Sequence, residues 1–376
     1  MGFAERFFDE TFTVLKPNFI KGEQEKFYTD IDHDGKFSLK LPILNTQELY
    51  LDWKRTRLRA VLEPGDTLFL FVDINDFLPT DEDKKNYEGY IDRPKQILYM
   101  GNNSRLNNEI AQYKGSWQSV NTEDLKKVSD MEFLDACKSV YEKRIAKLNN
   151  YIHNSPHISE KFKTYATKEE KSNLAYYLMQ RRFVVYDRKE IKFPPAYMQY
   201  IKANFPLDDE IDYTLTDNFT IFLSDYIGYH TAQYNHEIFA IESVEQRLNE
   251  DGKMTDEIKQ HLSGLYYLVE KIEKDPENKD LVRDFNNKLD LAFKIPIMQE
   301  TRLDLIKENQ FLSTTIADSL ISNKNLKELW MVNRCEYWFK HNRKPLSKQM
   351  QQAVAEKVKN PYLLASVGNL KKNINK

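Results

Sequence analysis

Cysteine and glycine are both scarce in this chain of 376 residues. The two cysteines, Cys137 and Cys335, lie far apart and form no C-x-x-C pair. Only 11 residues are glycine, and neither a P-loop nor a dinucleotide-binding pattern occurs. The sequence therefore argues against phosphate-cradling loops and contains no thiol-redox motif.

Long apolar runs are missing as well, since none approaches the roughly 18 residues of a membrane span. The first ten residues, MGFAERFFDE, place charges where a secretory signal would be apolar, so no signal peptide is visible; a mature or truncated chain would look the same. The formal net charge of −3 balances 55 basic against 58 acidic residues. This balance gives no electrostatic basis for binding nucleic acid or an anionic membrane.

The composition that remains is typical of a folded protein, with 41% hydrophobic and 13% aromatic residues. The length exceeds the about 100 to 200 residues of a single domain, so two domains are expected. Strand patterns fill the first hundred residues, and helical patterns follow. The predicted fold class is α+β, with an antiparallel β-sandwich domain over residues 1–103 and a larger all-helical domain over residues 104–376.

The strand prediction is organised around residues 61–73, VLEPGDTLFLFVD. Pro64 and Gly65 suit the two central positions of a type II turn. Residues 68–72 are apolar on both faces, as expected of a central strand. Short strands with turn signals every 8 to 12 residues indicate a sandwich. The other predicted strands are 11–15, 26–31, 36–41, 48–53, 56–62 and 97–100, and residues 79–90 are predicted to be a loop.

Apolar residues recur at three- and four-residue steps from residue 104 onwards. One stripe runs from Phe133 to Ile152 and stops near Asn154. The cleanest stripe runs from Ile258 to Ile272 and has Thr255 as its expected N-cap. Further helices are predicted at 162–186, from 196, and at 281–293, 304–319, 326–340 and 347–358.

Two motifs suggest metal or thiol chemistry and leave alternatives open. Asp30-x-Asp32-x-Asp34-Gly35 matches the opening of a calcium loop, but Leu41 occupies the position of the required glutamate. A hairpin turn or a weak, nonclassical cation site both explain these residues. Both cysteines lie on apolar helical stripes, so we interpret them as buried, inert thiols, with a disulfide or a reactive pair as the alternative.

No constellation of catalytic residues is evident, so the predicted site residues, cofactors and metals are none. His153 and His157 are separated by Asn154-Ser155-Pro156, and His230, His236 and Glu237 form no H-E-x-x-H. The acidic run at residues 208–210 is typical of a helix start, and no G-x-S-x-G occurs.

Tyrosines are dense in the helical part. They could line a groove that binds a peptide, or they could simply be helix contacts with hydroxyls in water. The tyrosines concerned are Tyr176, Tyr177, Tyr186, Tyr226, Tyr229, Tyr234, Tyr266 and Tyr267.

Taken together, LEPGDTLFLFVD after a D-x-D-G-x-F hairpin, followed by ILYMGNNSRLNNEI, resembles the N-terminal region of the TlpA-like thiol:disulfide oxidoreductases of Bacteroidetes. In that family a β-sandwich of the DUF4369 type carries the Pro-Gly-Asp turn. A glycine and a following asparagine, here Gly101 and Asn107, open its helical region. Asn360-Pro361-Tyr362-Leu363, with Asn369 after it, resembles the last helix and linker before the family's thioredoxin domain. The resemblance implies a location in the periplasm or cell envelope.

The departure from the family concerns its catalytic part. The family's thioredoxin domain carries W-C-x-x-C, and neither Cys137 nor Cys335 lies in such a motif. The chain is either the N-terminal part of a longer protein or a natural form without the redox domain, and we expect it to be redox-silent.

These observations lead to two functional hypotheses. The first is a noncatalytic binding or scaffold region of a thioredoxin-family envelope protein, with envelope proteins or a thioredoxin domain as partners; a purely structural or assembly role through the tyrosine face would differ only in its partner. The second is an unrecognised enzyme such as a hydrolase, with a site between the sandwich and the helices and a pKa-shifted group in it.

Overall fold

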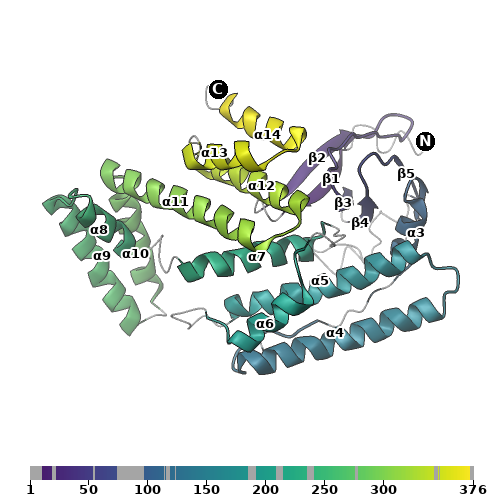
Figure 1. Cartoon of the computed structure of the whole chain (residues 1–376), viewed down its shortest axis with the longest axis horizontal. Coiled ribbons are helices and arrows are strands. Elements are labelled where there is room, and N and C mark those ends of the chain that lie inside the picture. Colours follow the sequence, from purple (N-terminus) through teal and green to yellow (C-terminus); the bar gives the residue numbers. More distant parts are fainter. Residues whose placement is uncertain are drawn as a thin grey trace. The chain divides into compact units, whose positions relative to one another are not determined.

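Two antiparallel sheets precede a larger helical part, so the predicted α+β class is confirmed (Figure 1). The computed structural model describes residues 11–18, 23–53, 56–73, 97–113, 115, 119–122, 124–184, 192–208, 215–234, 241–275, 278–342, 346 and 348–372. The predicted loop at 79–90 lies outside these residues.

The first sheet has four strands in the order β2-β1-β3-β4, and the second pairs β5 with β6. Within the described part of the chain, these six strands pair with one another only in the antiparallel sense. The strands are β1 (Thr11–Asn18), β2 (Glu23–Asp30), β3 (Gln47–Trp53), β4 (Thr56–Leu62), β5 (Leu68–Val72) and β6 (Ile97–Gly101).

The two sheets share one apolar core. The first sheet contributes alternate side chains, as a half-buried strand should. The second contributes the buried Tyr99 of β6 and the partly buried inner residues of both strands. The fully buried members are Phe12, Val14, Ile31, Leu49, Leu51, Leu58, Ala60 and Tyr99.

The predicted Pro-Gly turn joins the two sheets as expected. The backbone N–H of Asp66 donates to the carbonyl of Glu63 at 3.1 Å, and Gly65 has φ of +85°. The Asp66 carboxylate also accepts from the N–H of Glu63 at 2.8 Å. Glycine is required here because a type II turn needs positive φ at this position.

Two strand predictions are wrong. Residues 36–41 are not a strand, although Phe37, Leu39 and Leu41 still pack on the core. The alternate apolar side chains of this segment contact the core of the sandwich, but its backbone forms no ladder of hydrogen bonds with a neighbouring strand. The strand at 68–72 is not central: among the described residues β5 pairs only with β6, and its second apolar face is exposed.

Most helices begin and end within a few residues of the predicted positions, but the helix predicted at 304–319 begins at Pro296, eight residues earlier. Thr255 caps α9 by accepting from the N–H of Ile258 at 3.3 Å, and α4 ends at the C-cap Asn154. No range was predicted for three helices, α3, α7 and α8. The full set is α3 (Ser104–Gln112), α4 (Asp130–His153), α5 (Glu160–Val184), α6 (Pro195–Asn204), α7 (Asp217–Tyr234), α8 (Ile241–Glu250), α9 (Asp256–Lys274), α10 (Lys279–Ala292), α11 (Pro296–Leu320), α12 (Lys324–Asn342), α13 (Lys348–Lys357) and α14 (Pro361–Lys372).

The chain forms two compact units, Met1–Tyr226 and Ile227–Lys376. The predicted boundary between residues 103 and 104 lies where strands give way to helices. The first compact unit, however, contains both the sandwich and helices α3 to α6. In the first unit α4 lies against α5, and α3 contacts β4, β6 and α5. In the second unit α9 packs on α10, and α12 contacts α11, α13 and α14.

Candidate functional site

The first sheet has a polar outer face. Leu49 and Leu51 of β3 face the core, so Glu48 and Tyr50 lie on the opposite side. The same alternation on β4 places Arg57 and Arg59 on this face, and Tyr50 pairs directly with Arg59 across the two strands. Charged and polar side chains of β3 and β4 are therefore gathered on the face that lies away from the apolar core.

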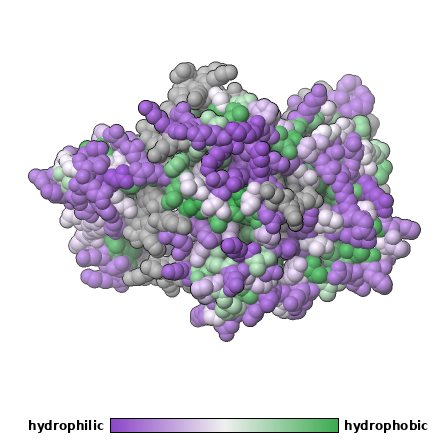
Figure 2. Space-filling view, viewed as in Figure 1, coloured by the Kyte–Doolittle hydropathy of each residue, from purple (hydrophilic) through white to green (hydrophobic). Residues whose placement is uncertain are grey.

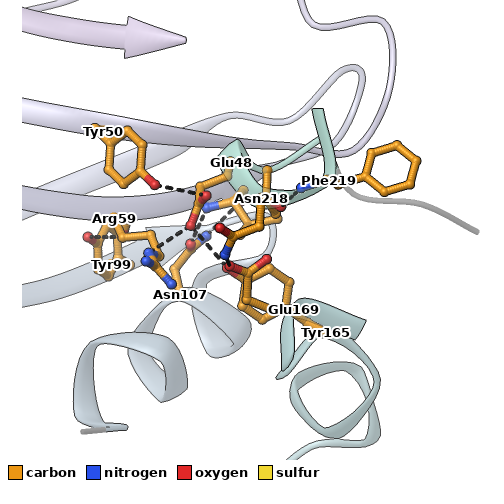
Figure 3. Close-up of polar contacts among 11 residues, drawn as sticks. Glu48, Tyr50, Arg59, Tyr99, Asn107, Tyr165, Glu169, Asn218 and Phe219 are labelled. Carbon is orange, nitrogen blue, oxygen red and sulfur yellow. Dashed lines mark hydrogen bonds and ion pairs between the residues drawn. The ribbon is translucent and has the colours of Figure 1, made fainter. Parts of the chain in front are cut away.

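A cluster of polar side chains surrounds Glu48, as Figure 3 shows. The carboxylate of Glu48 is only 1% exposed, and Arg59 Nε lies 2.7 Å from its Oε1. The hydroxyl of Tyr165 donates to Oε1 at 3.2 Å, and that of Tyr50 donates to Oε2 at 3.2 Å. These contacts satisfy a buried charge that would otherwise be costly. We call Glu48, Tyr50, Arg59, Tyr165, Glu169, Thr216, Asp217 and Asn218 the Glu48 cluster.

Glu169 brings a second carboxyl group to the cluster from α5. Its Oε1 accepts from Asn218 Nδ2 at 2.8 Å, and its Oε2 is buried. Burial and the nearby Glu48 carboxylate raise the pKa of Glu169 to about 7. Burial and Glu48 also raise the pKa of Asp217, at the start of α7. The cluster therefore holds a carboxyl group that exchanges a proton near neutral pH.

Two consecutive asparagines of α3 secure the outer strands beside this cluster. The side chain of Asn107 accepts from the N–H of Val61 at 2.6 Å and donates to its carbonyl at 2.9 Å. Asn108 makes the same pair of bonds with Tyr99, both at 2.9 Å. The two side-chain amides provide hydrogen-bond partners for backbone groups at the edges of β4 and β6. Without them these backbone groups would lack partners there.

Gly101 and Asn103 turn the chain from β6 into α3. Gly101 has φ of +91°, and a Cβ atom there would lie 2.4 Å from the carbonyl oxygen of Thr67. Asn103 has positive φ and hydrogen-bonds through its side chain to Asp66. The GNNSRLNNEI segment therefore positions α3 against the edge of the sandwich.

A second feature is the outer face of the second sheet, which is apolar and exposed. Phe69 pairs with Met100 and Phe71 pairs with Leu98 across the two strands. Their exposed fractions are 59%, 44%, 64% and 50% respectively. Hydrophilic residues dominate the visible surface in Figure 2, with hydrophobic residues among them. We call Phe69, Phe71, Leu98 and Met100 the β5–β6 apolar face.

The prediction of buried, inert cysteines is confirmed. Cys137 on α4 and Cys335 on α12 are both free and buried. Burial raises the pKa of each thiol to about 12. Neither thiol is a nucleophile at neutral pH, because the thiolate is the reactive form.

The calcium-like motif forms a turn that follows β2. Asp32 Oδ1 accepts from the N–H groups of Asp34 and Lys36 at 2.9 and 2.8 Å, which lower the pKa of this carboxyl. Gly35 has φ of +75°. Within the part of the chain that the structure describes, no three acidic, histidine or cysteine side chains are placed to hold a metal ion.

The histidines and tyrosines that the sequence analysis singled out lie in different surroundings, and one pair is in contact: the rings of Tyr229 and His230 pack edge to face, with centroids 5.3 Å apart. His153 ends α4, and His157 follows it in a loop where its carbonyl accepts from Arg105. Tyr226 and Tyr229 are buried, which favours the helix-contact interpretation for them. Tyr266 hydrogen-bonds to Glu245, and Tyr267 is exposed. Tyr186, Asp209, Glu210, His236 and Glu237 lie outside the described residues.

Sequence reasoning missed both the Glu48 cluster and the β5–β6 apolar face. The signal for the first was present in β3 and β4, where charged residues alternate with core residues. The signal for the second was the apolar character of both faces of residues 68–72. Neither pattern says what covers a face, because that depends on contacts between distant segments.

Among the described residues no helix is long and apolar enough to cross a membrane. Comparison of the chain with protein-family models, with curated proteins and with solved structures finds no match.

Proposed function

We propose that this chain is a noncatalytic binding and scaffold region of a cell-envelope protein that resembles the TlpA-like thiol:disulfide oxidoreductases. The observation that carries the proposal is the β5–β6 apolar face. Contiguous exposed apolar side chains mark interaction surfaces, whereas apolar residues scattered singly do not. The resemblance in residues 61–73 and 97–108 adds the periplasm or cell envelope as the compartment and a protein as the partner.

The partner that we propose is a thioredoxin domain of the TlpA type. Four half-exposed side chains of this size leave on the order of 400 Å² of apolar surface in water. A stable interface of standard size buries about 800 Å² on each partner. The face is therefore too small for a stable dimer and suits a weak contact with a domain that is kept close by.

The buried thiols support the noncatalytic part of the proposal. Thiol exchange needs an accessible thiolate, and burial keeps both Cys137 and Cys335 protonated. Insulin reduction in the presence of dithiothreitol should therefore proceed at the background rate. Turnover that disappears in Cys137→Ser or Cys335→Ser would overturn this part.

Binding is tested by titrating the chain with the thioredoxin domain of a TlpA-like protein, followed by calorimetry. We expect weak, saturable binding that the double variant Phe71→Glu, Leu98→Glu reduces at least tenfold. Tyr28→Glu is the matched control, because Tyr28 on β2 is 60% exposed and lies outside the face. Binding that is absent in the parent chain, or equal in both variants, would contradict the proposal.

A second candidate function is that of a hydrolase with its site between the first sheet and helix α5. The Glu48 cluster favours it, because Arg59 and Tyr165 contact Glu48 and the nearby Glu169 has a pKa of about 7. A carboxyl with such a pKa is suited to general acid–base catalysis.

The hydrolase is tested with p-nitrophenyl esters and glycosides. Turnover by the parent chain that Glu169→Gln abolishes would support it. Glu160→Gln is the control, because Glu160 is exposed on the same helix. Background rates for all three proteins would remove this candidate.

A further inference from the structure

We propose that the carboxyl groups of Glu48, Glu169 and Asp217 form a proton-sensitive latch that fastens the start of α7 to the outer face of the first sheet. All the groups involved lie in the first compact unit. The inference is independent of the proposed binding partner.

The backbone shows what the latch fastens. Leu215, two residues before α7, forms a parallel bridge with Gln47 at the start of β3. The N–H of Glu48 donates to the carbonyl of Leu215 at 3.1 Å, and the N–H of Leu215 donates to the carbonyl of Thr46 at 2.9 Å. Only these two bonds connect the segment to the strand in the described residues, so side-chain contacts beside them matter for its attachment.

The side chains lie directly beside this bridge. Asn218, in the first turn of α7, reaches α5 through its bond to Glu169 (Figure 3). Tyr165, also on α5, donates to Glu48 of β3 at 3.2 Å. The latch therefore connects three elements: β3, α5 and the start of α7.

The charges in the cluster do not balance when every carboxyl is ionised. Arg59 forms the ion pair with Glu48, and Arg57 pairs with Asp52 through two bonds of 2.8 Å. Among the described residues, no lysine or arginine then forms an ion pair with Glu169 or Asp217. The charged and titratable groups that face them are Glu48 and Tyr50 from β3, Arg57 and Arg59 from β4, and Tyr165 from α5.

A proton relieves this imbalance. When Glu169 is protonated, one negative charge is removed from beside Glu48 and Asp217, and the start of α7 can lie against the sheet without repulsion. When the pH rises past neutrality the proton leaves, and the like charges favour separation of α7 from the strand. The segment therefore opens more often at alkaline pH than at acidic pH.

The size of the effect follows from linkage. Opening exposes Glu169 to water, where its pKa returns towards the ordinary value of 4.5 from about 7. Between pH 6 and pH 8 the opening equilibrium should then increase about tenfold.

The test is hydrogen exchange of the amides of Glu48 and Leu215, with rates corrected for the intrinsic effect of pH on exchange. In the parent chain we expect the protection factors to fall about tenfold from pH 6 to pH 8. Glu169→Gln should remove most of this dependence, and Glu160→Gln, an exposed change on the same helix, should retain it. Protection that does not vary with pH in the parent, or that varies equally in Glu169→Gln, would overturn the proposal.

A second measurement does not depend on the folding of any variant. Carbon-13 NMR of the parent chain follows the side-chain carboxyl of Glu169 during a pH titration. A midpoint near 7 supports the latch, and a midpoint near 4.5 overturns it.

Discussion

The outer faces of the two sheets in this sandwich are opposite in character. The outer face of the first sheet carries Glu48, Tyr50 and Arg59, and helix α5 contacts it through Tyr165. The outer face of the second sheet carries Phe69 and Phe71 and is exposed. Each sheet thus has residues in an unusual environment: a buried charge in the first and exposed aromatic side chains in the second. Such residues indicate a role beyond packing of the core.

The difference between the two faces distinguishes a surface that packs against helices from one that we propose binds a partner. Charged groups under helices need partners with defined geometry, so the face of the first sheet determines where its helices sit. Apolar groups in water cost free energy until something covers them, so the face of the second sheet is suited to a partner.

The largest expected loss of stability comes from Asn107→Ala, on the side of the first sheet. Asn107 is completely buried, and its loss leaves both backbone groups of Val61 without a partner. We expect the free energy of unfolding to fall by about 2–4 kcal/mol. Asn108→Ala removes the matching bonds to Tyr99 at a half-buried site and should cost about 1–2 kcal/mol. Urea denaturation measures both, and equal losses would contradict the proposed difference between the sheets.

The next effect is a dependence of stability on pH. The pKa of Glu169 is about 7 in the folded chain and 4.5 ordinarily, so the folded state binds more protons between these values. Stability should therefore be highest below pH 4.5 as far as this group is concerned, fall as the pH rises to 7, and then level off. The full loss is at most about 3 kcal/mol. Thermal unfolding at pH 5 and pH 8 should show this loss of stability in the parent chain and not in Glu169→Gln. A parent chain whose stability relative to Glu169→Gln is unchanged or greater at pH 8 would contradict the prediction.

A smaller effect is expected at the turn between the sheets. Gly65 has φ of +85° with open space around its Cα, so Gly65→Val should cost only the backbone strain, about 1–2 kcal/mol. Pro64→Ala should lower the melting temperature less, because it only loosens the unfolded chain. An unchanged melting temperature for Gly65→Val would show that the turn is misassigned.

The smallest effect is expected on the exposed face itself. Phe71→Ser should change the free energy of unfolding by less than about 0.5 kcal/mol, because the side chain is 64% exposed. Leu70→Ala, on the inner face of the same strand, should cost about 1–2 kcal/mol. Chemical denaturation compares the two variants, and a large loss for Phe71→Ser would show that the face is part of the core.

Local patterns in the sequence predicted the local structure. Pro64 and Gly65 predicted the turn because only a few residues fit its dihedral angles, and Thr255 predicted the start of α9 because its hydroxyl accepts a first-turn N–H. The apolar stripes predicted α4 and α9 because their helical period is regular. These signals need only neighbours in the chain.

Contacts between distant segments could not be predicted in the same way. Glu48 and Tyr165 are 117 positions apart, and nothing near either residue indicates the other. Residues 36–41 alternate as a strand would, yet they lie on the core without pairing. The same limit explains β5, whose two apolar faces suggested a central strand although only one of them is buried.

The most direct test of the separation between the two faces is NMR mapping of the chain as a TlpA-type thioredoxin domain is added. We expect the amide signals of Phe69, Phe71, Leu98 and Met100 and the methyl signals of Leu98 and Met100 to shift, while the amide signals of the Glu48 cluster do not. Shifts confined to Glu48, Arg59 and Glu169, or no shifts at saturating concentrations of the domain, would contradict it.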